Sequence, residues 1–227
     1  MDFLNRMEIM LSSEDIEKIK SKSVLIFGLG GVGGSCAETM ARSGIGRIGI
    51  VDKDVFDVTN INRQIFATMD SIGKNKTDVA EERLLSVNPE LKIDKYNINF
   101  SKETAQDINF NDYDYIVDAI DTVTSKIELI EIATELNIKI ISSMGAGNRL
   151  DPTAFEITKI EKTKNDPLAR VMRKKLKEKG IKNVPVVCSR EIPIKTSNRT
   201  PGSISFVPPV CGMILTFFVI RDILNLN

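Results

Sequence analysis

The sequence of 227 residues contains no histidine. This absence excludes a Ser-His-Asp or Cys-His catalytic unit, and it also excludes a histidine proton shuttle. Any chemistry that the protein performs therefore depends on carboxylates, Lys, Arg, Tyr, Cys, backbone amides or a metal ion held by oxygen ligands.

Cysteine is scarce as well, because the chain has only Cys36, Cys188 and Cys211, far apart from one another. Their odd number and the lack of a Cys-x-x-Cys pair argue against a disulfide framework and against a structural zinc site. We expect all three side chains to pack in the core rather than to act as nucleophiles. A reduced, cytoplasmic location is the expectation from this pattern.

The sequence also lacks an excess of charge and a clear membrane segment. Its 31 basic residues balance 31 acidic ones, so the chain has no net positive charge to attract nucleic acid. A local basic face is still compatible with this balance. The N-terminus lacks a basic segment followed by an apolar run and does not resemble a signal peptide. The apolar stretch 210–226 is interrupted by Arg221 and Asp222 and falls short of the ~18 residues of a membrane span. A helix packed on a sheet is therefore favoured over an anchor, and no stable membrane insertion is expected.

Strands and helices are expected to alternate along the chain, which predicts an α/β fold with a Rossmann-like, mainly parallel sheet flanked by helices. The expected parallel strands are 24–27, 47–52, 91–96, 115–118 and 139–143, and the helices among them are 32–43, 74–87 and 124–136. After Gly147 we expect further strands at 155–160, 184–188 and 203–207, the last two open to antiparallel pairing. Between them, Asp166 as N-cap and Pro167 at the first helical position predict a helix that runs to Gly180.

The length allows one sizeable core, so we expect a single domain over residues 1–227. An N-terminal arm over residues 1–22 would contain a short amphipathic helix with Ser13 as its N-cap. Residues 23–147 would form a nucleotide-binding core. Residues 148–227 would form a substrate-side extension and a C-terminal helix.

A glycine-rich turn, Gly28-x-Gly30-x-x-Gly33, follows the first expected strand and opens the first expected helix. Such a turn lets backbone N–H groups approach phosphates, and the helix N-terminus adds a favourable dipole. Asp52 ends the second strand, where a carboxylate accepts hydrogen bonds from ribose hydroxyls. These features predict a nucleotide site that either NAD or ATP would satisfy.

Three charged residues favour ATP. Adenylation of a carboxylate places extra negative charge on the α-phosphate as pyrophosphate leaves, and Arg63 and Lys76 could stabilise that charge. Asp121 follows the fourth expected strand at the sheet edge where ligands bind, and we predict that it holds Mg²⁺. Asp118 either caps the next helix or braces the loop.

Several motifs make the pattern more specific, and together they resemble the ThiF/MoeB superfamily, which has the ubiquitin-activating type of adenylating fold. Those motifs are Gly28–Gly33, Asp52-Lys-Asp54, Thr59-Asn-Ile-Asn-Arg-Gln64, residues 73–76 and residues 118–121. Within the superfamily the chain most resembles the TcdA family of tRNA threonylcarbamoyladenosine dehydratases. The markers of that branch are residues 59–65, Ala119-Ile-Asp121-Thr-Val-Thr-Ser-Lys126, Gly145-Ala-Gly147, Asp151-Pro152-Thr153 and Asp166-Pro-Leu-Ala169. The resemblance covers nearly the whole chain, although the Cys-x-x-Cys zinc pair of many sulfur-carrier-activating relatives is absent.

The resemblance implies a reaction and an assembly. ATP would activate the threonyl carboxylate of the modified adenosine next to the tRNA anticodon, and the acyl-adenylate would then close on the ureido group. The family pattern implies a homodimer in which Arg6 reaches the ATP of the partner subunit. Sulfur-transfer or tRNA-maturation proteins are further partners to consider. The positions that match the ATP site of the family are Gly31, Asp52, Asp54, Thr59, Asn60, Arg63, Lys76, Asp121 and Thr122.

The helix expected after Asp166 is strongly basic, and Arg170, Arg173, Lys174 and Lys177 share one broad face of it. A basic helix face is most simply a solvated surface. In a chain without net charge it is also the best local candidate for contact with tRNA phosphates.

Three other functions remain open at this point. An enzyme of the same fold adenylates the C-terminus of a ubiquitin-like sulfur-carrier protein, and this would require a groove for a protein tail. An NAD-dependent oxidoreductase would bind NAD tightly but has no use for Arg63, Lys76 and Asp121. A nucleotide-sensing module would bind ATP without exchanging pyrophosphate.

Overall fold

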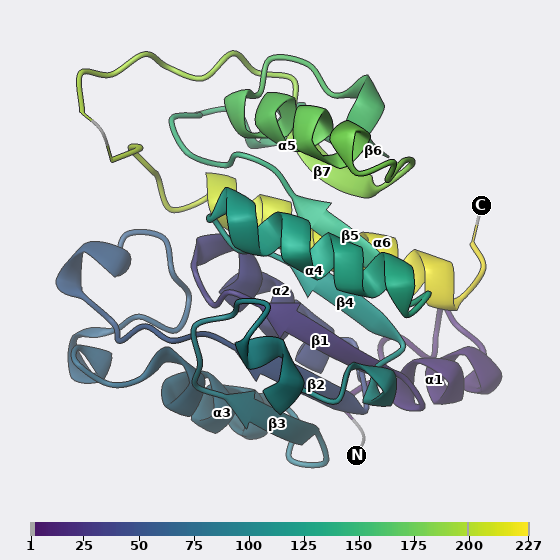
Figure 1. The fold of residues 1–227 in the computed structure, drawn as a ribbon. Helices are drawn as coiled ribbons and strands as arrows, with labels where there is room; N and C mark the ends of the chain where they lie inside the picture. Colours follow the sequence, from purple (N-terminus) through teal and green to yellow (C-terminus); the bar gives the residue numbers. More distant parts are fainter. Residues whose placement is uncertain (1–2, 199, 227) are drawn as a thin grey trace.

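Seven strands form one mixed sheet in the order β3-β2-β1-β4-β5-β7-β6 (Figure 1). The computed structural model describes residues 3–198 and 200–226. Neighbouring strands are parallel except for β6 and β7, which are antiparallel. The strands are β1 (Ser23–Phe27), β2 (Arg47–Val51), β3 (Lys92–Tyr96), β4 (Tyr115–Asp118), β5 (Lys139–Ser143), β6 (Phe155–Lys159) and β7 (Pro185–Ser189).

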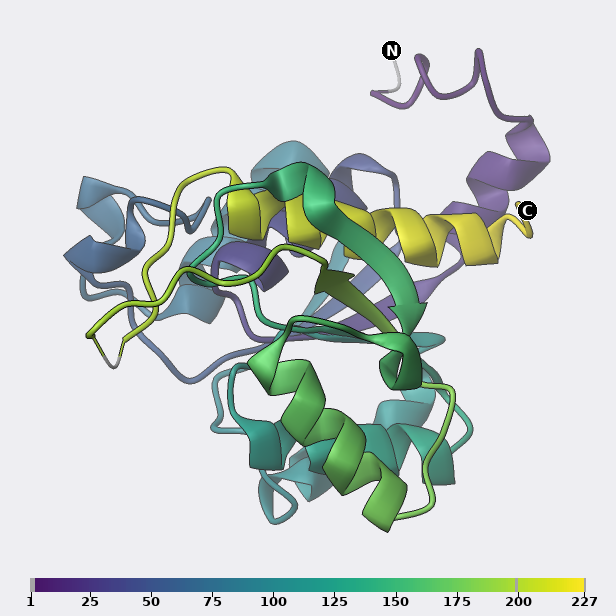
Figure 2. The same ribbon diagram turned by 90° about the horizontal axis from the view of Figure 1, so that it is seen from above.

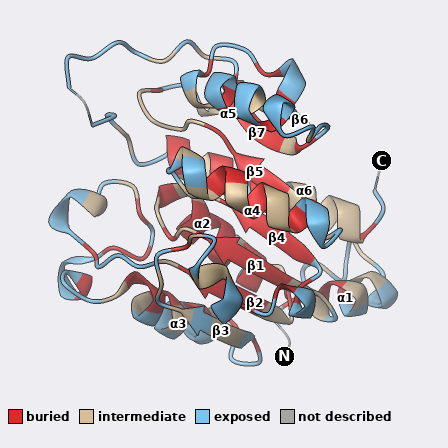
Figure 3. Cartoon of the chain, in the orientation of Figure 1, coloured by how far each residue is buried: buried red, intermediate tan, exposed pale blue. Residues whose placement is uncertain are grey.

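Strand β1 lies in the interior of the sheet because its side chains are suited to burial on both faces. The four residues from Val24 to Phe27 are fully buried, and the inner strands form the buried part of the molecule (Figure 3). Val24 and Ile26 contribute to one apolar cluster, whereas Leu25 and Phe27 contribute to another. This division follows from the alternation of side chains along a strand.

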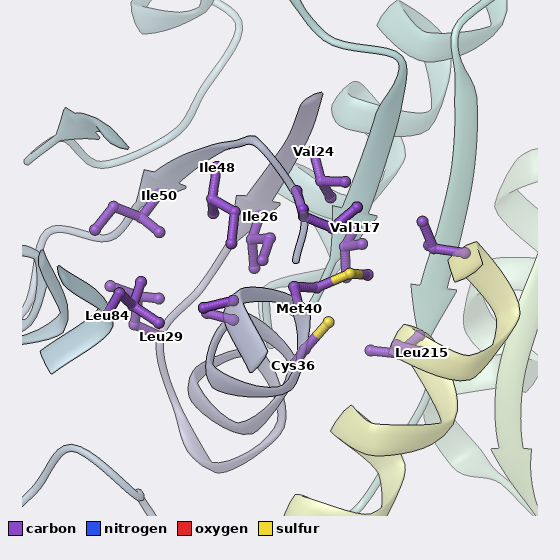
Figure 4. Close-up of a cluster of buried hydrophobic side chains, with 14 of the residues drawn as sticks. Val24, Ile26, Leu29, Cys36, Met40, Ile48, Ile50, Leu84, Val117 and Leu215 are labelled. Carbon is purple, nitrogen blue, oxygen red and sulfur yellow. The ribbon is translucent and has the colours of Figure 1, made fainter. Parts of the chain in front are cut away.

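Helices cover both faces of this sheet (Figure 2). On one face Met40 of α2 and Leu215 of α6 pack near Ile26 and Val117 (Figure 4). On the other face Leu129 of α4 belongs to the cluster that contains Leu25 and Phe27. The helices are α1 (Ser13–Lys20), α2 (Gly31–Arg42), α3 (Lys76–Val87), α4 (Val123–Glu135), α5 (Pro167–Glu178) and α6 (Val207–Ile223).

The apolar C-terminal run forms α6, which packs closely on α2. A Cβ atom on Gly212 would overlap the carbonyl oxygen of Val32, so a glycine is needed where the two helices meet. Thr39 and Thr216 share a hydrogen bond of 2.6 Å across the same contact. The prediction that this run packs on the sheet is confirmed. Among residues 3–198 and 200–226, no helix is long and apolar enough to cross a membrane.

Two local predictions are wrong. Residues 203–207 do not form a strand, because residues 203–206 are irregular or in a turn and α6 begins at Val207. Pro208 and Pro209 cannot donate hydrogen bonds to a sheet but fit the first turn of a helix, so this segment starts α6. The N-cap of α1 is Ser12 rather than Ser13, because the Ser12 hydroxyl accepts a hydrogen bond of 3.1 Å from the N–H of Asp15.

The strands expected at 155–160 and 184–188 and the helix between them are confirmed, but the antiparallel partner of β7 is β6 rather than residues 203–207. Strands β6 and β7 pair in an antiparallel register, with Phe155 opposite Ser189. The helix expected after Asp166 is α5. Its N-cap is Asp166, whose carboxylate accepts a hydrogen bond of 2.8 Å from the N–H of Ala169, and Pro167 is its first residue.

Candidate active site at the carboxyl ends of the strands

The glycine-rich turn between β1 and α2 brings three backbone segments into close contact. Gly28 has a φ of +86°, and a Cβ atom there would lie 2.7 Å from the carbonyl oxygen of Ala119 after β4. A Cβ atom on Gly33 would overlap the carbonyl oxygen of Gly28. The N-cap of α2 is Gly30, which provides no capping side chain, so the first-turn N–H groups remain open to an anion.

Gly31, at the first position of α2, is enclosed by two other parts of the site. A Cβ atom on this residue would lie 2.9 Å from Cβ of Pro208 and 3.0 Å from the carbonyl oxygen of Arg63. The start of α6 and the segment that contains Arg63 therefore meet at the first turn of α2.

Asp52 lies directly beside the glycine-rich turn. One of its carboxylate oxygens accepts a hydrogen bond of 2.6 Å from the N–H of Leu29, and the other accepts one of 2.8 Å from the N–H of Asp54. Its side chain is 8% exposed. Asp52 thus fixes the turn to the end of β2, and carboxylate lone pairs remain for the ribose contact that the sequence predicts.

Lys76 is buried at the start of α3, close to two carboxylates. Its ammonium group lies 3.1 Å from a carboxylate oxygen of Asp54 and 4.0 Å from one of Asp52. The helix dipole disfavours a cation at this end, and only 7% of the side chain is exposed. The two carboxylates offset that cost. A nucleotide phosphate placed beside the ammonium would offset it as well.

The segment that contains Arg63 forms a tight turn after a short 3₁₀ helix, Val58–Asn60. One terminal nitrogen of Arg63, Nη1, donates hydrogen bonds of 2.8 Å to the carbonyl oxygen of Thr59 and 3.0 Å to the side chain of Asn62. Both hydrogen bonds that its guanidinium makes to the described residues come from Nη1, so Nε and Nη2 can serve a phosphate. The side-chain oxygen of Asn60 accepts a hydrogen bond from the N–H of Asp57, which stabilises the turn.

The two aspartates after β4 have different surroundings. Asp118 is fully buried and accepts hydrogen bonds of 2.9 Å from Lys126, 2.5 Å from the hydroxyl of Ser142 and 3.1 Å from the N–H of Ile120. It therefore braces the loop, which was one of the two roles expected for it. Asp121 is exposed, and its one hydrogen bond to the described residues is a long one of 3.3 Å from the hydroxyl of Thr122.

Lys126 is the residue that the sequence analysis missed. It lies in the motif of residues 119–126, which predicts no role for it, and the structure places its ammonium group fully buried against Asp118. The signal available in the sequence was a lysine on the apolar side of a helix, eight residues after Asp118, the acidic residue that ends a buried strand. A charge in that position requires a buried partner.

Asp121 fits the ligand preference of Mg²⁺. Within residues 3–198 and 200–226 no group of three or more Asp, Glu, His or Cys side chains is placed to hold a metal ion. Mg²⁺ often binds through one or two carboxylates together with the phosphates of its substrate. The exposed carboxylate of Asp121 can act as such a ligand.

Arg6 does not lie with these residues. It precedes α1 in a turn in which Leu4 is buried against Gly44. The neighbouring Phe3 and Leu4 line a cavity together with Ser23 and Arg47, the first residues of β1 and β2. The arm is thus at the amino ends of the strands, whereas the glycine-rich turn is at their carboxyl ends.

The three cysteines are buried, as expected. Burial raises the pKa of the Cys36 thiol to about 12, and it raises the pKa of the Cys188 thiol to about 12. Burial also raises the pKa of Cys211. These thiols are neutral at physiological pH, so none of them is activated as a nucleophile.

Sequence and fold place this site within a known group of proteins. Residues 4–225 match the ThiF family. The chain is 40% identical to the tRNA threonylcarbamoyladenosine dehydratase of Bacillus subtilis over 241 residues, which covers 97% of this chain and 94% of that protein.

Solved structures of the Escherichia coli enzyme TcdA, described as a tRNA N6-threonylcarbamoyladenosine dehydratase, have the same fold. The complex with AMP aligns with a TM-score of 0.91 and 30% identity, over 97% of this chain and 93% of that one. The complex with ATP aligns with a TM-score of 0.90 and 30% identity, over 98% and 93%.

The buried pair Asp118–Lys126 predicts a specific stability defect. Lys126→Met leaves the Asp118 carboxylate buried without its cation, which we expect to lower the free energy of unfolding by about 3–5 kcal/mol. Urea unfolding followed by circular dichroism measures this loss.

Lys179→Met is the matched control. It removes a partly exposed ion pair of 2.7 Å between Lys179 and Glu131, which lies on α4 as Lys126 does. This substitution should lower the free energy of unfolding by no more than about 1 kcal/mol. The double variant Asp118→Asn/Lys126→Met should recover part of the loss. If Lys126→Met and Lys179→Met lose the same free energy of unfolding, the buried pair contributes no more to stability than a partly exposed pair.

Proposed function

This chain belongs to the ThiF family, and we propose that it is an ATP-dependent enzyme that cyclises N6-threonylcarbamoyladenosine in tRNA. The observation that carries the proposal is the arrangement of Arg63, Lys76 and Asp121 around the glycine-rich turn. Similarity to the Bacillus subtilis dehydratase over nearly the full length of both chains supports the choice of substrate. Residues 1–227 would act as one adenylating domain in the cytoplasm.

The proposed reaction has two steps. An oxygen of the threonyl carboxylate attacks the α-phosphorus of ATP, the bond to pyrophosphate breaks, and an acyl-adenylate forms. The ureido group then attacks the acyl carbon and gives up a proton to solvent, and the bond from the acyl carbon to the AMP oxygen breaks. AMP leaves with one of the former carboxylate oxygens, so the nucleoside loses the elements of water. A carboxylate is already ionised at neutral pH, so activation needs alignment and charge stabilisation rather than a histidine base.

We assign the main site residues a role in the first step. Arg63 and Lys76 stabilise the charge that develops on the α-phosphate, and the amide groups of the turn at Gly28, Gly30, Gly31 and Gly33 hold the phosphates. Asp52 accepts hydrogen bonds from the ribose. Asp121 would hold Mg²⁺, which supplies charge neutralisation for the phosphates when bound. The remaining positions assigned to the ATP site are Asp54, Thr59, Asn60 and Thr122.

The proposal predicts that Lys76→Ala abolishes cyclisation without unfolding the protein. The reason is that the transition state loses a cation held close to the phosphates. Mass analysis of nucleosides from threonylcarbamoylated tRNA, incubated with ATP and each protein, measures the dehydrated product. Lys74→Ala, an exposed lysine two residues earlier, is the matched control and should retain activity.

The same experiment separates this function from its alternatives. Pyrophosphate release on addition of modified tRNA supports the proposal. Release only on addition of a ubiquitin-like sulfur carrier would assign the site to carrier adenylation instead. Retained cyclisation in Lys76→Ala would remove this lysine from the mechanism.

We also propose that the enzyme is a homodimer whose active site includes Arg6 from the partner subunit. The support is the location of the arm at the edge of the sheet opposite the glycine-rich turn, near the C-terminal end of α6 (Figure 2). Arg6 is too remote to join the site of its own chain in this arrangement. A second copy could bring the arginine to the nucleotide.

A mixing experiment tests this arrangement. Arg6→Ala and Lys76→Ala should each be inactive alone, because each lacks one cation at the phosphates. After the subunits exchange, half of the sites in each mixed dimer would contain both cations, so random mixing should restore about a quarter of the wild-type activity. No recovery after verified exchange would contradict the contribution of Arg6 from the partner.

Helix α5 is the surface that we propose for tRNA. The carboxylate of Asp166, at the start of α5, accepts a hydrogen bond of 2.9 Å from the N–H of Gly145 after β5, so this end of the helix lies at the carboxyl ends of the strands, as the glycine-rich turn does. Arg170, Lys174 and Lys177 are exposed. Arg173 is different, because its guanidinium donates hydrogen bonds of 2.9 Å and 2.7 Å to Thr163 and is committed within the protein.

Charge reversal on this helix tests the tRNA surface. Lys174→Glu/Lys177→Glu should weaken tRNA binding and flatten its dependence on salt, because fewer counterions are released from the phosphates. Filter binding over a range of KCl concentrations measures both effects. Lys92→Glu/Lys102→Glu makes the same change in net charge at two exposed lysines elsewhere and should bind tRNA as the wild type does. Equal weakening in both double variants would indicate a general charge effect.

A further inference from the structure

The segment that joins β7 to α6 lies near the candidate active site. We call the described residues of this connection, 190–198 and 200–206, the strap. It leaves the end of β7 and returns to the start of α6, beside the site (Figure 2). Pro208, which follows the strap in α6, is one of the two residues that enclose Gly31. The strap therefore ends where the phosphates are proposed to bind.

Asn148 holds the strap at two points. Its carbonyl oxygen accepts a hydrogen bond of 2.7 Å from the N–H of Ile194. Its side-chain oxygen accepts one of 2.6 Å from the N–H of Gly202, and its own N–H donates one of 2.8 Å to the carbonyl oxygen of Gly202. Asn148 has a φ of 57°, a conformation that asparagine tolerates better than most residues. Asn148 thus fixes the strap at Ile194 and at Gly202.

Asn62 links this strap to Arg63. Its side-chain nitrogen donates a hydrogen bond of 3.0 Å to the carbonyl oxygen of Ser203, and its side-chain oxygen accepts one of 3.0 Å from Nη1 of Arg63. An amide provides a donor and an acceptor on one rigid group, and both are used here. A carboxylate could keep the contact with Arg63 but could not donate to Ser203.

Buried polar atoms near Asn62 also lack hydrogen-bond partners among the described residues. Among the described residues, three buried side-chain atoms have no hydrogen-bond partner, namely Gln64 Oε1, Thr77 Oγ1 and Ser203 Oγ. Ser203 is the residue that Asn62 contacts, and Gln64 follows Arg63. Two of the three such atoms therefore lie in the segments that Asn62 connects.

We propose that Asn62 is a positioning residue that couples the position of the strap to the orientation of Arg63. When tRNA fixes the strap, the amide of Asn62 holds the guanidinium in the orientation that the α-phosphate requires. This inference rests on the proposed function, because it assumes that Arg63 acts in adenylation. It extends that function by making the chemical step depend on the segment between β7 and α6.

Two variants at one position separate coupling from simple orientation. Asn62→Asp keeps an acceptor for Arg63 and loses the donor to Ser203, whereas Asn62→Ala loses both. If Asn62 couples the two segments, both variants should lower kcat for cyclisation by about tenfold to a hundredfold, with the KM for ATP little changed. Asn109→Asp is a control for the change in charge, because Asn109 is exposed and its side chain makes one hydrogen bond among the described residues, to Asp112.

Limited trypsin digestion provides a readout that a loss of stability alone would not reproduce. Lys195 lies on the strap and is exposed. Threonylcarbamoylated tRNA with a non-hydrolysable ATP analogue should protect the peptide bond after Lys195 from trypsin in the wild type and in Asn109→Asp. It should not protect this bond in Asn62→Asp or Asn62→Ala. Thermal unfolding should give similar midpoints for all four proteins.

The outcomes are distinguishable. Wild-type kcat and wild-type protection in Asn62→Asp would overturn the coupling, and a slow Asn62→Ala beside a normal Asn62→Asp would reduce Asn62 to a partner of Arg63 alone, which also overturns it. Absence of cyclisation in the wild-type protein would instead overturn the proposed function. Protection of Lys195 can be measured in that case as well.

Discussion

The close contact of three backbone segments at the glycine-rich turn is the constraint on which the site depends. Gly28 faces the carbonyl oxygen of Ala119, and Gly33 faces the carbonyl oxygen of Gly28, with no room for a side chain in either place. These contacts bring the end of β1, the start of α2 and the loop after β4 together. The N-terminus of α2 and the carboxylate of Asp121 consequently belong to one edge of the sheet, where a nucleotide can contact both.

Around that constraint the charged residues divide into those that build the site and those that remain open to a ligand. Asp118 and Lys126 are fully buried and satisfy each other, so they define the loop without facing the substrate. Asp52 fixes the glycine-rich turn through the N–H of Leu29. Arg63 keeps part of its guanidinium open, and Asp121 is exposed. The structure thus separates the two aspartates of one short motif into a support and a candidate ligand.

Local patterns predicted the elements well where one physical cause dominates. The apolar run 24–27 forms a buried strand, and Asp166 followed by Pro167 starts a helix, because burial and capping act over a few residues. The prediction failed at residues 203–207, where the prolines at 208 and 209 decide in favour of a helix start. The role of Lys126 was also missed, because a lysine in a helix is most often exposed and its partner lies in another element.

Apart from residues 203–207, the sequence alone determined the order of strands and helices, and it also determined the glycine-rich turn and the residue types available for chemistry, because these follow from periodicity, turn residues and composition. It also indicated an adenylating family through motifs spread over the chain. Only the tertiary structure decided which charges are buried together, that Arg6 lies at the opposite edge of the sheet from the glycine-rich turn, and that Asn62 contacts both Ser203 and Arg63. These contacts join residues distant in sequence, and their geometry depends on how the whole sheet is assembled.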